Sequence, residues 1–150
     1  MNKQQPGKPL LVLDTNVVFD LLHFDDVAAR PLLHALEAGR VRCAATDATL
    51  EEWRRVLGYP EFALDAARQA ALFERYQVLS EKVADVEAVA SLPPCSDPDD
   101  QKFIELAAAV RAAVLVSKDR AVLKLRHRCA PLFRVMTPAE AVRWLDAEPD

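Results

Sequence analysis

Apolar and polar residues follow two patterns along the chain, and together these patterns predict strands and helices in turn. Short continuous apolar runs are typical of strands buried on both faces of a parallel sheet. Apolar residues spaced three or four apart are typical of a helix with one buried face. The predicted strands cover residues 10–13, 41–45, 114–117 and 133–136, with a further short extended segment at 82–86. The predicted helices include a helical turn that ends at residue 22 and then cover residues 27–38, 46–57, 64–79, 98–112, 119–125 and 137–145.

Residues that start and stop helices agree with this division. Gly39 stands where a helix commonly ends in a left-handed residue. Asp97 is placed to cap a helix that has Pro98 at its first position, and Thr137 and Glu140 form a capping-box pattern. The alternation of strands and helices predicts an α/β domain, in which helices cover both faces of a parallel sheet through right-handed crossovers.

The composition is that of one globular domain and excludes several classes of protein. The chain has 150 residues, of which 51% are hydrophobic, enough for a single core. Its three glycines cannot form a dinucleotide-binding, P-loop or α/β-hydrolase motif. Three widely spaced cysteines are expected to be free thiols in a reducing cytoplasm. No apolar run approaches the ~20 residues of a membrane helix, and residues 1–9 are expected to be a flexible lead-in and not a secretory signal.

Charge is distributed unevenly, although the net charge is −4. Residues 81–105 contain seven acids and two lysines, whereas residues 106–134 contain seven Lys/Arg and one acid. An acidic region beside a basic one suits a site that binds cations and phosphates together. Two solvated faces of unlike sign explain the same distribution, and on charge alone this second interpretation is the more common one.

Carboxylates recur at positions that the predicted sheet would bring together. Asp14 and Asp119 each lie just past an apolar strand, and the ends of parallel strands meet at the edge where ligands bind. Asp97 and Asp100 open the helix that precedes one of these strands, so its start points back toward the same edge. Glu52 lies about one turn into the helix after the second strand and can project there too.

A cluster of carboxylates is tolerable when a divalent cation neutralises it, and oxygen ligands favour Mg²⁺ or Mn²⁺. The chemistry that fits is metal-assisted hydrolysis of a phosphodiester. Each acid also has an ordinary role as a helix cap or ion-pair partner, and taken singly this role is the more common explanation. Their convergence favours the site, because capping does not require acids at both strand exits and on the helix between them.

Four segments, in this order, resemble the motifs of the PIN-domain family. They are Leu-Asp-Thr-Asn-Val at 13–17, Glu-Trp-Arg-Arg-Val-Leu at 52–57, the Asp-Pro-Asp-Asp opening of 97–107, and Val-Leu-Val-Ser-Lys-Asp at 114–119. Order and spacing match over about residues 10 to 146, which is the expected extent of the domain, and residues 147–150 are expected to be a tail.

The resemblance implies a three-layer α/β/α sandwich with a mainly parallel sheet of about five strands. It also implies a Mg²⁺- or Mn²⁺-dependent endoribonuclease, of a kind often described as the toxin of a bacterial toxin–antitoxin pair, with an antitoxin partner. Many relatives form homodimers. Carried over by position, Asp14, Glu52, Asp100 and Asp119 are the catalytic acids and metal ligands, with Asp97 as an outer ligand. The residues expected to support the site by hydrogen bonds are Thr15, Asn16 and Ser117.

The fourth segment departs from the family pattern. Lys118 stands where a glycine is frequent, and Ala121 stands where some members carry a further aspartate. We therefore expect Asp14, Glu52 and Asp100 to hold the main cation, with Asp119 assisting.

A run of basic residues follows the fourth segment. Arg120 and Lys124 share a helical face that could guide single-stranded or structured RNA, although a solvated face explains them equally well.

Two other functions are alternatives to a ribonuclease. One is that of a degenerate PIN domain that binds protein or RNA without catalysis. The other is a phosphatase with Asp14 as the nucleophile, but such enzymes carry a second aspartate where this chain has Asn16.

Overall fold

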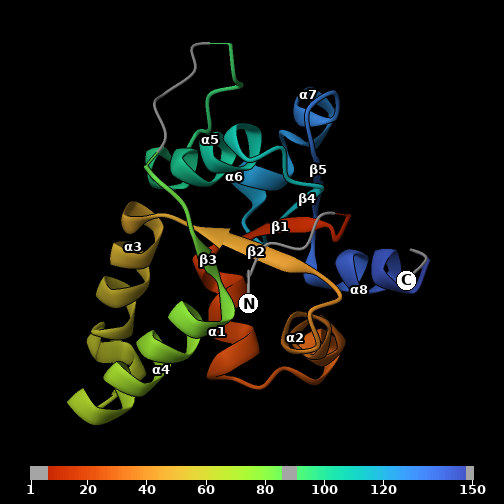
Figure 1. Cartoon of the computed structure of the whole chain (residues 1–150). Coiled ribbons are helices and arrows are strands. Elements are labelled where there is room, and N and C mark those ends of the chain that lie inside the picture. The colour runs from red at the N-terminus through yellow and green to blue at the C-terminus, as the bar shows by residue number, and fades with distance from the viewer. Residues whose placement is uncertain (1–6, 86–90, 148–150) are drawn as a thin grey trace.

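Five strands form one sheet in the computed structural model, which describes residues 7–85 and 91–147 (Figure 1). The strand order is β3-β2-β1-β4-β5, and every neighbouring pair is parallel. The sheet is therefore wholly parallel within the described residues, as the continuous apolar runs indicated. The strands are β1 (Leu10–Leu13), β2 (Arg42–Ala45), β3 (Glu81–Lys82), β4 (Val114–Val116) and β5 (Arg134–Met136).

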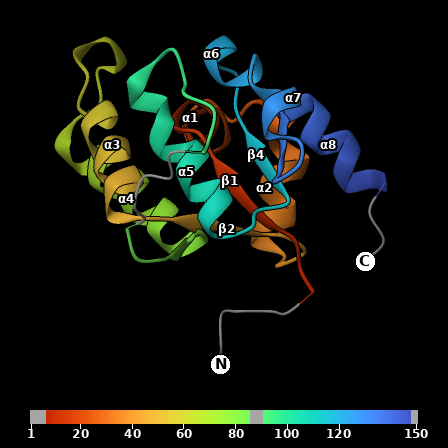
Figure 2. The same cartoon turned by 90° about the horizontal axis from the view of Figure 1, so that it is seen from above.

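Helices cover both faces of this sheet, which confirms the predicted three-layer α/β/α architecture (Figures 1 and 2). Successive residues of a strand point to opposite faces. Leu11 and Leu13 accordingly pack in a core with α1, α2, α3, α4 and α8, whereas Val12 packs in a second core with α5, α6 and α7. The α-helices are α1 (Thr15–Leu22), α2 (Arg30–Glu37), α3 (Asp47–Leu57), α4 (Ala66–Leu79), α5 (Gln101–Ala109), α6 (Arg120–Leu123), α7 (Arg126–Cys129) and α8 (Pro138–Ala147). Three short 3₁₀ helices are η1 (Val27–Ala29), η2 (Pro60–Phe62) and η3 (Pro98–Asp100).

Trp53 fixes the position of α3, the helix that also carries Glu52. Its side chain is 1% exposed, and its indole N–H donates a hydrogen bond of 3.3 Å to the carbonyl of Leu72 on α4. Its ring meets Phe19 of α1 edge-on, with the centroids 4.9 Å apart. Burial of an aromatic ring of this size is among the largest single contributions to a core. The contacts therefore hold α3 against both α1 and α4, and α3 and α4 lie side by side at one side of the molecule (Figure 2).

Two helix predictions were wrong at their ends. The helix predicted to run to residue 112 stops at Ala109, because Arg111 adopts a left-handed conformation with φ of 54°. The N–H of Arg111 bonds to the carbonyl of Ala108 and that of Ala112 to Ala107, which is the usual hydrogen-bond pattern of a helix end. The helix predicted at 119–125 is shorter, spanning 120–123, and a separate short helix that was not predicted follows it at 126–129.

The extended segment predicted at 82–86 is smaller than expected. It is the two-residue strand β3, whose Glu81 and Lys82 pair with Ala44 and Ala45 of β2. Residues 83–85 are not in a strand, and residue 86 lies outside the described residues. Gly39, in contrast, has a φ of 75° just past α2 and ends that helix as predicted.

Candidate active site

Asp14 is held at the junction of the central strand β1 and helix α1. Its backbone N–H donates to the carbonyl of Val116, which ties the end of β1 to the end of β4. Its Oδ1 accepts a hydrogen bond of 2.7 Å from the N–H of Thr15, and its Oδ2 accepts one of 2.6 Å from the hydroxyl of Ser117. The side chain is 3% exposed. Asp14 is therefore a buried carboxylate whose position is fixed by two strands and one helix.

Asp119 reaches the same place from β4. Its N–H donates a hydrogen bond of 3.0 Å to the hydroxyl oxygen of Ser117, and its Oδ1 caps α6 by accepting from the N–H of Ala121 at 2.8 Å. Ser117 is fully buried, so its hydroxyl connects Asp14 to the backbone of Asp119 with no solvent between them. The predicted support role of Ser117 thus corresponds to a specific set of hydrogen bonds.

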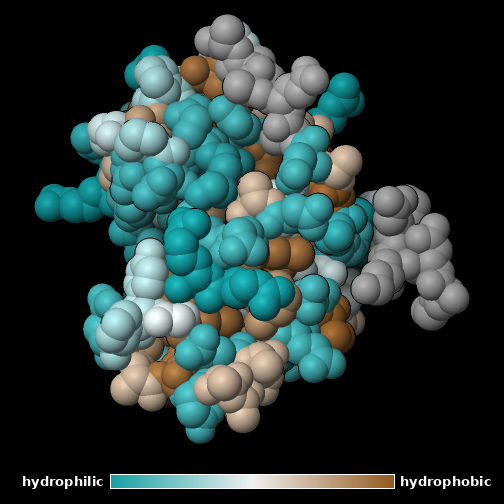
Figure 3. All heavy atoms as spheres, turned by 90° about the vertical axis from the view of Figure 1, so that its left-hand side faces the viewer, coloured by the Kyte–Doolittle hydropathy of each residue, from teal (hydrophilic) through white to brown (hydrophobic). Residues whose placement is uncertain are grey.

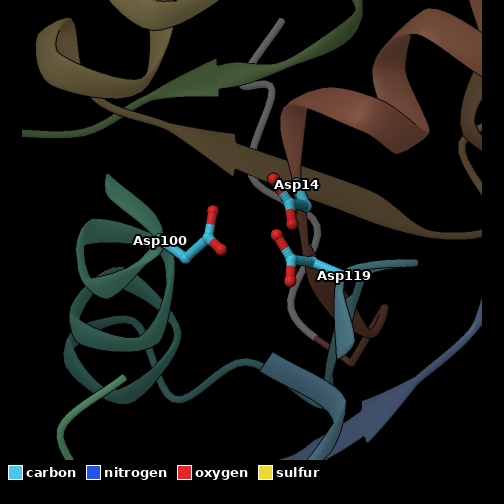
Figure 4. Close-up of side chains that lie close together, drawn as sticks. All are labelled: Asp14, Asp100 and Asp119. Atoms are coloured by element: carbon cyan, nitrogen blue, oxygen red, sulfur yellow. The ribbon is translucent and has the colours of Figure 1, made fainter. Parts of the chain in front are cut away.

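Asp100 arrives from the opposite side of the site, at the start of α5 (Figure 4). Asp97 caps the preceding η3 by accepting from the N–H of Asp99 at 3.0 Å, and this tight turn orients the residues that follow. Asp100 is 7% exposed, and its Oδ2 is buried without a hydrogen-bond partner among the residues that the structure describes. A buried, unpartnered carboxylate oxygen is energetically costly, so this atom is suited to bind a cation.

Asp14, Asp100 and Asp119 form an acidic trio (Figure 4). One carboxylate oxygen from each lies within 4.8 Å of the other two. The pKa of Asp14 is raised to about 6, chiefly by burial and in part by the charges of Glu52 and Asp119, against the lowering effect of the hydrogen bonds from Ser117 and Thr15. Burial also raises the pKa of Asp100 to about 8, together with its hydrogen bond to Asp119 and the charge of Asp14. The negative charge of the trio is thus poorly compensated by the protein, and the trio could hold a metal ion.

Glu52 lies beside the acidic trio and is not part of it. Its Oε2 accepts a hydrogen bond of 2.5 Å from the hydroxyl of Thr15. Its Oε1 is ion-paired with the ammonium of Lys102, and the guanidinium of Arg55 lies 3.8 Å away. Lys102 also donates to the carbonyl of Asp99 at 2.8 Å, which fixes the ammonium between α3 and η3. The charge of Glu52 is therefore already compensated by the chain's own cations.

A cleft of about 430 Å³ opens over the acidic trio. Its lining combines two kinds of side chain, namely the acids with Thr15 and a group of aromatic rings. Arg55 and Lys118 supply positive charge to the lining. The face that carries α3 and α4 is mostly hydrophilic, with hydrophobic residues exposed in small patches (Figure 3). The lining residues named by the sequence prediction are Asp14, Thr15, Asn16, Glu52, Asp97, Asp100 and Asp119.

Two predicted RNA-binding residues lie elsewhere. Arg120 and Lys124 are exposed at the two ends of α6 but do not line the cleft. The cleft is lined instead by Arg55 and Lys118, and Lys102 pairs with Glu52; the sequence prediction named none of these three as site residues. Lys118 donates its N–H to Asn16 at 3.4 Å and its ammonium pairs with Asp20 at 2.6 Å.

A second cavity, of about 600 Å³, lies between α7, β5 and α8. It is larger than the cleft, but none of the predicted site residues lines it. Arg126 and Glu140 in its wall are paired with each other at 3.1 Å. None of the helices in the described part of the chain combines the length and apolarity that crossing a membrane requires.

Comparison with known proteins gives a family match and a likeness of fold to solved structures. Residues 10–121 match the sequence profile of the PIN domain. The fold is similar to a chain in the crystal structure of VapBC2 from Rickettsia felis bound to a DNA fragment from their promoter, with a TM-score of 0.59 and 12% sequence identity. That match covers 85% of this chain and 98% of the other. No curated protein sequence matches the chain.

Proposed function

The chain belongs to the PIN-domain family, and from this membership we propose that it is a metal-dependent endoribonuclease that hydrolyses phosphodiester bonds in RNA. The observation that carries the proposal is the acidic trio, in which the Oδ2 of Asp100 is buried and has no hydrogen-bond partner in the described part of the chain. Three carboxylates without histidine or cysteine form a donor set of hard oxygen atoms. Such a set favours Mg²⁺ or Mn²⁺ over softer metals.

The proposed ligands of the cation are Asp14, Asp100 and Asp119. When bound there, the divalent ion supplies a Lewis acid that lowers the pKa of water and offsets negative charge on the phosphodiester. Ser117 and Thr15 hold Asp14 in a fixed orientation, so the ligands need little rearrangement. This division differs from the expected one, in which Glu52 was a main ligand and Asp119 an assistant.

Glu52 takes a positioning role in this proposal. Its two oxygens hold the hydroxyl of Thr15 and the ammonium of Lys102 in fixed positions. Lys102 is fixed close to the acidic trio, where its positive charge can stabilise the phosphate of the substrate as negative charge develops on it. Asp97 caps η3 through Oδ1. Its second carboxylate oxygen is the proposed outer ligand of the cation.

The RNA backbone is proposed to follow the positive residues at the cleft mouth. Arg55 and Lys118 line the cleft itself. Arg120 and Lys124 are exposed on α6, directly after Asp119, and extend positive charge away from the acidic trio. Such contacts hold the phosphate backbone without reading its sequence.

We also propose that the chain is the toxin of a bacterial toxin–antitoxin pair. The PIN-domain membership and the likeness of the fold to a chain of the VapBC2 complex support this. The partner would be a small antitoxin protein, and both would act in the cytoplasm. Co-expression with the product of a neighbouring small gene, followed by co-purification, tests this part of the proposal.

The decisive experiment compares Asp14→Asn with a matched control. Purified protein is incubated with single-stranded RNA and Mn²⁺, and cleavage is followed on a gel while calorimetry measures Mn²⁺ binding. We expect Asp14→Asn to lose both cleavage and Mn²⁺ binding. The control is Asp65→Asn, which changes another helix-capping aspartate, exposed at the start of α4 and outside the cleft, where asparagine caps equally well. Cleavage by Asp14→Asn at the wild-type rate would refute the proposal.

A further inference from the structure

Aromatic rings form one wall of the cleft that contains the acidic trio. This aromatic wall consists of Phe24, Tyr59 and Phe62, which come from the end of α1 and from the segment around η2. Phe24 is 55% exposed and Tyr59 is 39% exposed. Large exposed rings gathered in a cleft mark a binding surface more often than scattered single rings do.

The aromatic wall is supported from behind and does not collapse onto the floor of the cleft. Phe62 stacks on the buried ring of Phe19, with centroids 4.4 Å apart and planes inclined by 29°. Tyr59 lies nearly parallel to Phe62, at a centroid distance of 6.5 Å and an angle of 9°. Phe24 meets Phe62 edge-on at 6.3 Å. The outer rings of Tyr59 and Phe24 are therefore presented to the cleft on a rigid base.

The charged groups that share the cleft with the aromatic wall suit the phosphate of a nucleotide. Arg55 lies one helical turn before Tyr59, and a side-chain hydrogen bond with Tyr59 raises the pKa of Arg55. The acidic trio, at which the proposed cation would hold a phosphate, lines the same cleft. The cleft volume of about 430 Å³ is within the range of pockets that hold small ligands, and one nucleotide is a ligand of this size.

We propose that the aromatic wall binds one unpaired base, next to the phosphodiester held at the acidic trio, so that the substrate is single-stranded at this position. Bases stack on aromatic side chains when the strand is unpaired, whereas the base faces of a duplex are occupied by neighbouring bases. This inference deepens the proposed function and rests on its assignment of the cleft to RNA. A nucleic acid is favoured over an apolar protein segment because the wall shares its cleft with carboxylates and cations.

The test is a binding measurement that does not depend on cleavage. Fluorescence anisotropy is recorded with a labelled single-stranded RNA, with the same strand in a duplex, and with the same strand carrying abasic spacers. The protein carries Asp14→Asn, and a gel checks that the RNA stays intact. The variants are Tyr59→Leu and Phe24→Leu, which keep apolar bulk without a ring, and Tyr59→Trp, which keeps a ring. The control is Val78→Ala on α4, which changes another exposed apolar residue outside the cleft.

We expect each leucine variant to bind the intact single strand roughly tenfold more weakly, and Tyr59→Trp to bind it nearly as well as the parent protein. The abasic strand should bind the parent protein roughly tenfold more weakly, and the leucine variants should cause no further loss with it. The abasic comparison needs no wall variant, so it stays decisive if a variant fails to fold.

Equal affinity for intact and abasic strands would overturn the inference. So would unchanged binding in both leucine variants, which would leave the aromatic wall as a protein-docking surface. Failure of the proposed function gives a different result. In that case the wild-type protein cleaves no RNA with Mn²⁺, yet the affinity still depends on the presence of the bases.

Discussion

The hydroxyl of Ser117 donates a hydrogen bond of 2.6 Å to Asp14, a residue 103 positions away in the sequence. The same hydroxyl accepts from the N–H of Asp119 at 3.0 Å. One buried serine therefore sets the spacing of two of the three carboxylates. It also compensates part of the charge of Asp14, since its hydrogen bond lowers the pKa of that carboxylate against the effect of burial.

Ser117→Ala should weaken cation binding in a way that depends on pH. Without the hydroxyl, the pKa of Asp14 rises above about 6, so protons compete with the cation at higher pH than before. A hydrogen bond to a charged group contributes about 1.5–3 kcal/mol, and we expect roughly a tenfold loss of Mn²⁺ affinity at neutral pH. Calorimetry at pH 6 and pH 8 should show the larger deficit at pH 6. Ser80→Ala, which removes another buried serine hydroxyl, should bind Mn²⁺ normally, and an equal deficit at both pH values would contradict the explanation.

Asp100→Asn should stabilise the metal-free protein at pH 8 while abolishing its cation binding. The pKa of Asp100 in the folded protein is about 8, above the ordinary value of 3.8. The folded state therefore binds a proton that the unfolded state has released, and the stability of the metal-free wild type falls as the pH rises from about 4 to about 8. Asparagine carries no charge and removes this loss. Thermal unfolding in EDTA should give the variant the higher Tm at pH 8 and no advantage at pH 4.

Addition of Mn²⁺ provides the second half of the same test. At pH 8 the ion should raise the Tm of the wild type, because it binds the folded state alone, and should leave the Tm of Asp100→Asn unchanged. A wild-type Tm that does not depend on pH in EDTA would show that Asp100 is not destabilising.

Lys102→Met should lower both stability and activity, because the negative charge of Glu52 then loses its main compensating cation. Glu52 is 7% exposed, so its carboxylate stays buried when the ammonium is lost. The cation that remains beside it is the more distant Arg55. Loss of one partner of a buried pair is costly because the remaining charge is uncompensated. The double variant with Glu52→Gln should therefore be more stable than Lys102→Met alone. Cleavage should fall at least tenfold, whereas Lys82→Met, which breaks an exposed pair with Asp47, should change neither property appreciably.

Substitution of single positive residues should show how much the cleft and the outer surface each contribute to RNA binding. Arg55→Gln and Lys118→Gln should each weaken binding of single-stranded RNA and lower the slope of log affinity against log salt by roughly 0.7. Arg120→Gln and Lys124→Gln should have smaller effects, because these residues do not line the cleft. Arg68→Gln on α4 serves as a control outside the cleft. A larger effect from Arg120 and Lys124 than from the cleft residues would place the main RNA path along α6.

The sheet and the meeting place of the acids could be predicted because both depend on local pattern and general topology. Short apolar runs located β1, β2, β4 and β5, and the rule that parallel strands share a carboxyl edge brought Asp14 and Asp119 together. The start of the helical segment formed by η3 and α5 was readable from Asp97 and Pro98, which begin η3. Its end was not, because Arg111 adopts a left-handed conformation that usually requires glycine or asparagine.

The cleft walls could not be predicted because they depend on tertiary packing. Phe24, Tyr59 and Phe62 belong to helix ends and turns without periodic pattern, and they become a surface only where Phe19 supports them. The pairing of Lys102 with Glu52 joins residues 50 positions apart on different helices. Helical spacing reveals ion pairs within one helix, such as Arg55 with Glu52, but not pairs between helices.

The acidic trio draws on residues at positions 14, 100 and 119 of a 150-residue chain, and β4 must pair with β1 before two of its members can meet. A ribosome therefore synthesises most of the polypeptide before a competent centre can assemble. Nascent chains and early termination products lack the last of the three carboxylates. Under the proposed function, a chain that stops before Asp119 would lack one of the three cation ligands and would cleave no RNA.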